Sequence, residues 1–192
     1  MSVHRSMRRN RTAWAVGFFL IVSCFMAAGL AQVTKEKQDL EAIHGRLAKE
    51  VRHELVMLPY YSVFDNLTFR IEGVDGLVLM GQVVKPTLKQ DAENVVRDLE
   101  GAGKVVNKIE VLPLSPNDDR IRLAAFRAIY SRQGLDRYAL SAVPSIHIIV
   151  KNGNITLEGV AMNQPDKDLA GIAAKQVSGA FSVTNNLRLE SK

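Results

Sequence analysis

The stretch GAFSVTNNLRL, residues 179–189, almost repeats the stretch GAGKVVNKIEV, residues 101–111. Both begin with glycine, have valine at the fifth position and asparagine at the seventh, and end on alternating apolar residues. The two stretches are offset by a constant 78 residues. Self-similarity at a fixed spacing indicates repeated structural units, so the sequence predicts a fold built from two copies of one small unit.

The repeat continues upstream as a β-hairpin in each copy. GLVLMGQV (76–83) parallels NITLEGVA (154–161), with glycine at the sixth position of both. The alternating apolar runs LTFRI (67–71) and IHIIV (146–150) precede them, with the turn sequences EGVDG and KNGN between. Alternation with β-branched residues indicates strands, and clusters of Gly, Asn and Asp between such runs indicate tight turns.

A helix is predicted after each hairpin, over residues 88–100 and 166–178. The apolar residues of each segment recur at i, i+3, i+4 and i+7, which places them on one helical face. They are Ala92, Val95, Val96 and Leu99 in the first copy, and Ala170, Ala173, Ala174 and Val177 in the second.

Signals for the ends of these helices are also present. Thr87 and Gln90 fit a capping box, in which side chains satisfy the free N–H groups of the first turn. Pro165 suits a first helical turn because its ring already has a helical φ. Gly101 and Gly179 are expected to end the helices, since glycine accepts the left-handed conformation of a helix cap.

Each copy also opens with a helix. The second opening helix follows LPLSPNDD (112–119), whose Pro, Ser and Asn residues are typical of a linker and a helix start. Because two helices cannot cover both faces of a three-stranded sheet, both are expected on one face. The sequence therefore predicts an α+β fold of two tandem small α-β-β-α-β domains, each a three-stranded mixed sheet with two helices packed on one face. The stripe of the first opening helix comprises Leu40, Ile43, Leu47, Val51, Leu55 and Leu58.

The predicted boundaries are 38–112 for the first domain, 113–117 for the linker and 116–190 for the second domain. The repeated asparagines, Asn107 and Asn185, are interpreted as structural residues that bond to the backbone near a bend.

The N-terminus has the plan of a secretory signal peptide over residues 1–31. A basic segment without acidic residues is followed by an apolar one, and Gly29 and Ala31 place small residues before a cut at Gln32. This predicts an exported, periplasmic protein. Two alternatives stay open: an uncleaved anchor, since the apolar stretch is about long enough to span a bilayer, and a lipoprotein anchored at Cys24.

The charge of the chain argues against nucleic-acid binding. The net charge is +5, but four of the 25 basic residues are signal-segment arginines. Without them, 21 basic residues face 20 acidic ones, a net charge of +1. A broad basic surface is therefore not expected, and no nucleic-acid partner is predicted. Because Cys24 is the single cysteine, the chain after the signal uses neither disulfides nor thiolate chemistry.

These features together resemble the BON (bacterial OsmY and nodulation) domain family. The resemblance rests on the order of elements in each copy and on two motifs. The order is a helix, a hairpin, a second helix and a final strand; the motifs are NGNITLEG in the hairpin and G-A-x-x-V-x-N-x-(I/L)-x-(V/L) in the strand. It covers residues 38–112 and 116–190 and is closer in the second copy. Two tandem copies behind an export signal are similar to periplasmic members. The resemblance implies a phospholipid- or envelope-binding protein, with a role in envelope maintenance or osmotic stress, rather than an enzyme.

The sequence offers no convincing catalytic, cofactor or metal site. His44 and His53 face opposite ways on a helix, because nine residues at about 100° each place them about 180° apart. His147 alternates with the apolar residues of its strand and is expected to face solvent. Two acidic pairs are expected at helix starts, where carboxylates interact favourably with the helix dipole. These are Asp118 with Asp119 and Asp166 with Asp168.

The segment DDRIRLAAFRAIYSRQG (118–134) departs from this pattern, because as a helix it has two apolar faces. One face suits a core. The other carries Leu123, Phe126 and Tyr130, bordered by Arg120 and Arg127 on one flank and Arg122 on the other. We interpret Leu123, Phe126, Tyr130, Arg122 and Arg127 as a site for anionic phospholipid, with apolar groups entering the headgroup layer and arginines pairing with phosphate.

Other readings of this helix and of the protein stay open. In one alternative, the second apolar face of helix 118–134 packs against the first domain. In another, a bend in the helix turns Tyr130 inward. A periplasmic protein-interaction or chaperone-like module would use a sheet edge or an inter-domain groove instead. A small-ligand or peptidoglycan-linked role is a third alternative.

Overall fold

A computed structural model describes the backbone of residues 13–190 and the side chains of residues 35–190. The chain divides into two compact units, Met1–Ile43 and His44–Lys192. Helix α1 spans Ala13–Val56. Across the described residues, no helix has the length and apolar character needed to cross a membrane. The predicted signal peptide and the lipidation alternative at Cys24 rest on residues 1–12, which lie outside the described residues, and on side chains that are not described.

The first sheet is mixed, as predicted. Strand β1 (Asn66–Glu72) pairs antiparallel with β2 (Gly76–Val83). Helix α2 (Pro86–Arg97) follows, and the chain then returns parallel to β2 as two short strands. These are β3 (Val105–Asn107) and β4 (Glu110–Val111).

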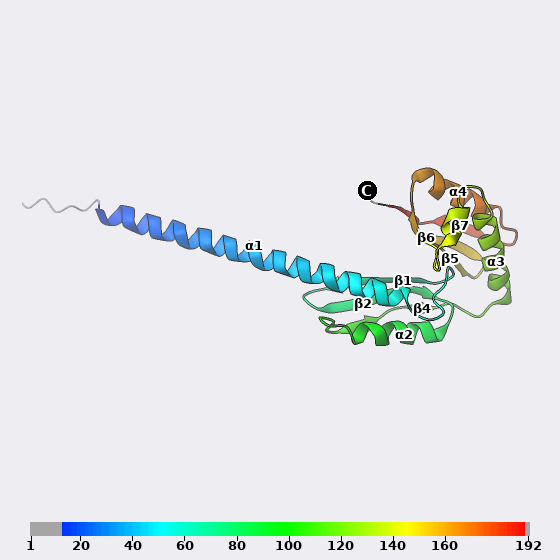
Figure 1. Ribbon diagram of the computed structural model, residues 1–192, viewed down its shortest axis with the longest axis horizontal. Helices are drawn as coiled ribbons and strands as arrows, with labels where there is room; N and C mark the ends of the chain where they lie inside the picture. Colours follow the sequence, from blue (N-terminus) through cyan, green and yellow to red (C-terminus); the bar gives the residue numbers. More distant parts are fainter. Residues whose placement is uncertain (1–12, 191–192) are drawn as a thin grey trace, which may run out of the picture. The chain divides into compact units, whose positions relative to one another are not determined.

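The second sheet repeats this order. After α3 (Pro116–Tyr130) and the short 3-10 helix η1 (Asp136–Leu140), β5 (Ile146–Lys151) pairs antiparallel with β6 (Asn154–Ala161). Helix α4 (Gln164–Lys175) leads to β7 (Ser182–Asn185) and β8 (Arg188–Leu189), both parallel to β6. Figure 1 shows α2 alongside the first sheet, and α3 and α4 next to each other beside the second. The α+β class and the repeated α-β-β-α-β order are confirmed. Each sheet has four strands instead of the predicted three, because the final strand of each copy is split in two.

The final strand of each copy is interrupted at the repeated asparagine. The Asn107 side chain donates to the Lys89 carbonyl of α2 at 2.8 Å and accepts from the Ile109 N–H at 3.0 Å. Asn185 repeats both bonds, to Lys167 at 2.7 Å and from Leu187 at 3.2 Å. The side-chain amide thus replaces a backbone partner where the strand bends. The structural role predicted for both asparagines is confirmed.

The repeated glycines of the hairpins are required by their backbone. Gly81 and Gly159 have φ values of 112° and 102°, a region that other residues rarely adopt. A Cβ at Gly81 would lie 1.9 Å from the Asn66 carbonyl oxygen, and one at Gly159 would lie 2.1 Å from that of Ser145. The close approach of the two hairpin strands therefore permits only glycine.

Two hydrophobic cores are present within the residues that the structure describes. The first lies between α1, β2 and α2, and the second between α3, α4 and the second sheet. Most residues of the apolar stripes predicted from the sequence are buried, but Ile43 is 40% exposed, and Leu40, Val95 and Leu99 are half-buried. The first core contains Leu47, Val51, Leu55, Leu58, Leu77, Leu79, Val83, Leu88, Ala92, Val96 and Ile109. The second contains Val63, Ile121, Ala125, Ile129, Ile146, Ile148, Val150, Ile155, Leu157, Ala170, Ala173 and Ala174, among others.

The helix ends differ from the prediction in detail. α2 begins at Pro86, two residues earlier than expected, and its N-cap residue Lys85 makes no side-chain capping bond, so the Thr87–Gln90 capping box is wrong. α4 starts as Pro165 indicated, with Asn163 as its N-cap. The helices end at Arg97 and Lys175. Gly101 and Gly179 do have positive φ values, but they shape the turns that follow the helices.

Candidate membrane-facing site

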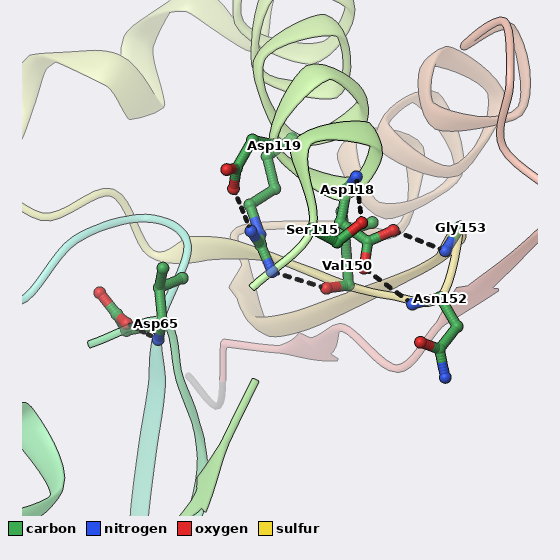
Figure 2. Close-up of polar contacts among 9 residues, drawn as sticks. Asp65, Ser115, Asp118, Asp119, Val150, Asn152 and Gly153 are labelled. Atoms are coloured by element: carbon green, nitrogen blue, oxygen red, sulfur yellow. Dashed lines mark hydrogen bonds and ion pairs between the residues drawn. The ribbon is translucent and has the colours of Figure 1, made fainter. Parts of the chain in front are cut away.

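The start of α3 is fastened to the hairpin of the second sheet. Ser115 caps the helix by accepting from the Asp118 N–H at 3.2 Å. The buried carboxylate of Asp118 accepts from the backbone N–H groups of Asn152 at 2.9 Å and Gly153 at 2.7 Å. Figure 2 shows these bonds between the helix start and the β5–β6 turn. Asp118 therefore does more than interact with the helix dipole, because it fixes α3 on its sheet.

Arg122 is part of this attachment. The whole residue is 3% exposed. One guanidinium nitrogen donates to the Val150 carbonyl at 2.9 Å, and the other pairs with Asp119 (Figure 2). Among the described residues its Nε has no hydrogen-bond partner. The solvent exposure that the lipid-site prediction needs at Arg122 is absent, because the helix start turns this side chain onto the end of β5.

Tyr130 also lies inside the fold. It is 7% exposed, and its hydroxyl donates to the Ile146 carbonyl. Burial raises the pKa of this phenol. Phe126 is half-buried between two rings, with centroids 4.8 Å from Tyr130 and 6.2 Å from Phe64. The open apolar face expected here is thus largely covered, and the alternative of packing against the first domain describes it better.

Two of the five predicted residues remain at the surface of α3. Leu123 is 50% exposed, and Arg127, one turn further along, is exposed as well. Residues four apart on a helix are neighbours on its surface. Lipid contact stays a prediction for all five residues, and the geometry favours it at Leu123 and Arg127.

Leu123 borders an apolar cleft of about 270 Å³. The opposite wall comes from the loop after α1 and the end of β2. Asp65 shapes this wall, since its carboxylate accepts from the Ser62 N–H at 3.0 Å, the Ser62 hydroxyl at 2.7 Å and the Val84 N–H at 2.7 Å. The lining residues are Tyr60, Ser62, Phe64, Asp65, Val84, Lys85, Asp119, Arg122 and Leu123.

The rim of the cleft carries an aromatic residue and a cation that the sequence did not indicate. Tyr60 is 72% exposed and has a φ of 69°, which is uncommon for a bulky residue. The Lys85 ammonium lies 4.0 Å from the centre of its ring, in cation–π geometry. We refer to Tyr60, Lys85 and Leu123, which line the cleft, together with Arg127, which lies one turn from Leu123 on α3 and does not line the cleft, as the rim. Only Leu123 and Arg127 lie in one segment, so no sequence pattern could join the four.

The expectation that His147 faces solvent is wrong. The ring points away from the core, as alternation predicted, but Tyr61 covers it with a centroid distance of 5.7 Å. Burial lowers the pKa of His147, and contacts with the backbone of Asp65 and Ser62 act in the opposite direction.

The other acidic residues singled out in the sequence have structural partners. Buried Asp166 accepts from the Tyr138 hydroxyl at 2.6 Å and pairs with Arg137. Asp168 accepts from the Gln164 side-chain amide at 2.7 Å on the surface of α4. In the described part of the chain, no three His, Cys, Asp or Glu side chains are grouped so that they could hold a metal ion.

The sequence model of the BON domain family matches residues 45–113 and 131–191, which make up most of the chain. This chain belongs to the BON domain family. The second BON match begins after α3, although Ile121, Ala125 and Ile129 of this helix lie in the second core. The start of the second BON domain at residue 116 stays a prediction.

Other comparisons add little to the family assignment. No curated protein matches this BON chain. Two solved structures of CdsD, a structural protein of the type III secretion system of Chlamydia trachomatis, are similar at 13% identity and a TM-score of 0.30. One, a C-terminal domain, covers 74% of this chain and 96% of its own, and the other covers 76% and 92%. These values are too low to support an argument.

Proposed function

We propose that this BON protein is a non-enzymatic component of a bacterial envelope that binds anionic phospholipid surfaces through the rim. BON domains are binding modules associated with membranes and phospholipids. We place the protein in the periplasm after export, with attachment at Cys24 as the alternative, and assign it to envelope maintenance or osmotic stress.

The observation that carries the proposal is the pairing of exposed apolar groups at one cleft with a cation that lines it, Lys85, and a cation one helical turn away, Arg127. Tyr60 and Leu123 are 72% and 50% exposed on its two walls. Lys85 stands over the Tyr60 ring, and Arg127 lies one turn from Leu123. Aromatic and aliphatic groups enter the headgroup layer, while cations beside them interact with lipid phosphate.

A vesicle-binding comparison tests this proposal. Protein in the form isolated from cells is mixed with phosphatidylglycerol or phosphatidylcholine vesicles, and bound protein is separated by flotation. Binding should be stronger to the anionic vesicles. It should weaken as salt rises from 0.1 M to 1 M, where the Debye length falls from about 10 Å to about 3 Å.

Matched variants distinguish vesicle binding by the rim from vesicle binding by the N-terminal apolar segment. That segment is identical in all of the variants. Leu123→Asp should weaken anionic-vesicle binding, because it places a charge where an apolar group enters the interface. The control Ile172→Asp changes an α4 residue of similar exposure, 52%, that does not line the cleft. Equal binding by the two variants would contradict the proposal.

The place of the protein is tested by N-terminal sequencing of envelope fractions. A start at Gln32 supports cleaved export. A lipidated start at Cys24 supports the lipoprotein alternative, and full-length protein confined to the inner membrane contradicts both.

A further inference from the structure

A second groove, of about 350 Å³, lies along β1 on a different part of the second compact unit. Its volume falls in the range of roughly 300–1,000 Å³ that is typical of ligand sites. Four consecutive residues of β1, 66–69, line it. Successive side chains of a strand point to opposite faces, so a cavity on one face of the sheet would meet only every second residue. The groove therefore runs along the edge of the strand.

β1 is an open edge of its sheet. The strand order is β1-β2-β3, with β4 also pairing to β2. Within the described residues, the backbone–backbone hydrogen bonds of β1 go to β2 only. An edge strand directs every second N–H and C=O away from its partner and can accept another strand there. The edge of β1 thus offers main-chain donors and acceptors to the groove.

The second sheet shows that such an edge accepts a chain segment in this fold. β5 holds the place of β1 in the repeat, and the Ile148 N–H of β5 donates to the Val63 carbonyl at 2.8 Å. At the edge of β1, the neighbouring group is the side chain of Tyr61 and not a backbone carbonyl. Burial raises the pKa of Tyr61 to about 12, and contact with the Leu67 backbone partly offsets this rise. Tyr61 forms part of the groove wall.

The walls carry apolar groups and two arginines. Leu55 and Val56 of α1 and Leu67 and Phe69 of β1 contribute apolar groups to the lining. Arg52 of α1 contributes one cation, and Arg188 of β8, in the second BON copy, contributes another. The one acidic lining residue, Glu158, already accepts from the Asn186 side-chain amide at 2.8 Å. The lining carries two arginines against one carboxylate, a net charge of +1, which favours an anionic occupant.

We propose that the groove along β1 binds an extended, acidic peptide segment, which adds to the first sheet as an extra strand. Main-chain bonds to the β1 edge would provide affinity, and alternate side chains would meet the arginines and the apolar wall. A row of main-chain donors and acceptors matches a peptide backbone, whereas a lipid headgroup or a nucleic acid has no matching row. This function goes beyond the proposed lipid binding and uses a different set of residues.

The first test uses a peptide of three Glu-Val repeats, blocked at both ends, added to the full chain. NMR amide shifts and hydrogen exchange report where it binds. We expect shifts and slower exchange at amides of β1, residues 66–69. A matched peptide of three Lys-Val repeats should bind at least about tenfold more weakly, because its charge repels Arg52 and Arg188.

Backbone methylation of the peptide tests strand addition directly. In a paired strand, alternate N–H groups point to the partner and the others point away. N-methylation of one alternate set should abolish binding, and methylation of the other set should leave it. If methylation of either set of N–H groups weakened binding equally, the proposal would be overturned, because binding by charge alone predicts equal effects.

Substitutions in the groove complete the test. Arg52→Gln and Arg188→Gln should each weaken the Glu-Val peptide roughly tenfold, the loss expected for a charged hydrogen-bond partner. The control Arg97→Gln removes a cation of α2 that is paired with Glu93 outside the groove, and should leave binding unchanged. Absence of binding at about 1 mM peptide, shifts centred on the rim, or protection of the β1 amides by phosphatidylglycerol vesicles would each overturn the proposal.

Discussion

The Ile148 N–H of β5 donates to the Val63 carbonyl at 2.8 Å, so the segment after α1 of the first copy bonds to the edge strand of the second sheet. Val63 is also buried in the second core, beside α3 and β5. The two repeats therefore have separate cores, but the second core includes a residue from the first repeat.

This relationship predicts how the second repeat behaves alone. Residues 114–192 should fold cooperatively, because their own helices and sheet supply the rest of the core, but with lower stability than in the full chain. The loss of Val63 alone corresponds to about 1.5–3 kcal/mol of apolar burial. Urea unfolding monitored by circular dichroism measures it. If residues 114–192 stay unfolded, the two repeats form one cooperative domain and the proposed boundary at 113–117 is wrong.

The repeated asparagines should be important for stability. Asn185→Ala removes the bonds to Lys167 and Leu187 and leaves the Leu187 N–H without its partner, at a cost of about 1–3 kcal/mol. The neighbouring Asn186→Ala removes only a surface contact with Glu158, so it should change stability by less than about 0.5 kcal/mol. Thermal unfolding of the two variants compares them. Equal losses would show that the bend does not depend on Asn185.

Local patterns predicted the repeating part of the fold. Hydrophobic periodicity located the hairpins and helices, since each buries one face, and the paired asparagines and hairpin glycines could be recognised because they occur twice. Helix ends were less accurate. Pro86 starts α2 earlier than the apolar stripe indicated, because a helix can begin before its first buried residue.

Contacts between the repeats could not be predicted in the same way. Alternation placed His147 on the outer face of its strand but could not show that Tyr61 covers that face. The pattern around Arg122 likewise gave its position on the helix and not its partner, the Val150 carbonyl. Val63 and Tyr60 lie in a segment without periodicity, so their burial and exposure follow from tertiary packing alone.

His147 should make the protein less stable in acid. Burial lowers its pKa in the folded state below the ordinary value of about 6.5. The unfolded state therefore binds the proton more readily, and stability present above about pH 6.5 falls as the pH falls toward the lower folded-state value. Tyr61 and Asp65 are titratable groups beside the ring, and Glu158 is the cross-strand partner of His147 on the same face of the sheet.

Urea unfolding between pH 8 and pH 5 measures this effect. His147→Gln removes the titrating group, so its loss of stability over this range should be smaller than that of the unchanged protein. Parallel curves for the two proteins would assign the acid sensitivity to other groups.

The last prediction asks which α3 residues stabilise the fold and which belong to the exposed surface. If Phe126 lay on an exposed lipid-binding face, Phe126→Asp would abolish lipid binding without loss of stability. With Phe126 packed between Phe64 and Tyr130, we now expect it to destabilise the fold by about 2 kcal/mol or more, because a charge replaces a ring in contact with the core. Leu123→Asp, at a half-exposed position, should change stability by less than about 0.5 kcal/mol. Thermal unfolding of both variants checks this order, and a stable Phe126→Asp protein that no longer binds vesicles would restore Phe126 to the lipid-contacting surface.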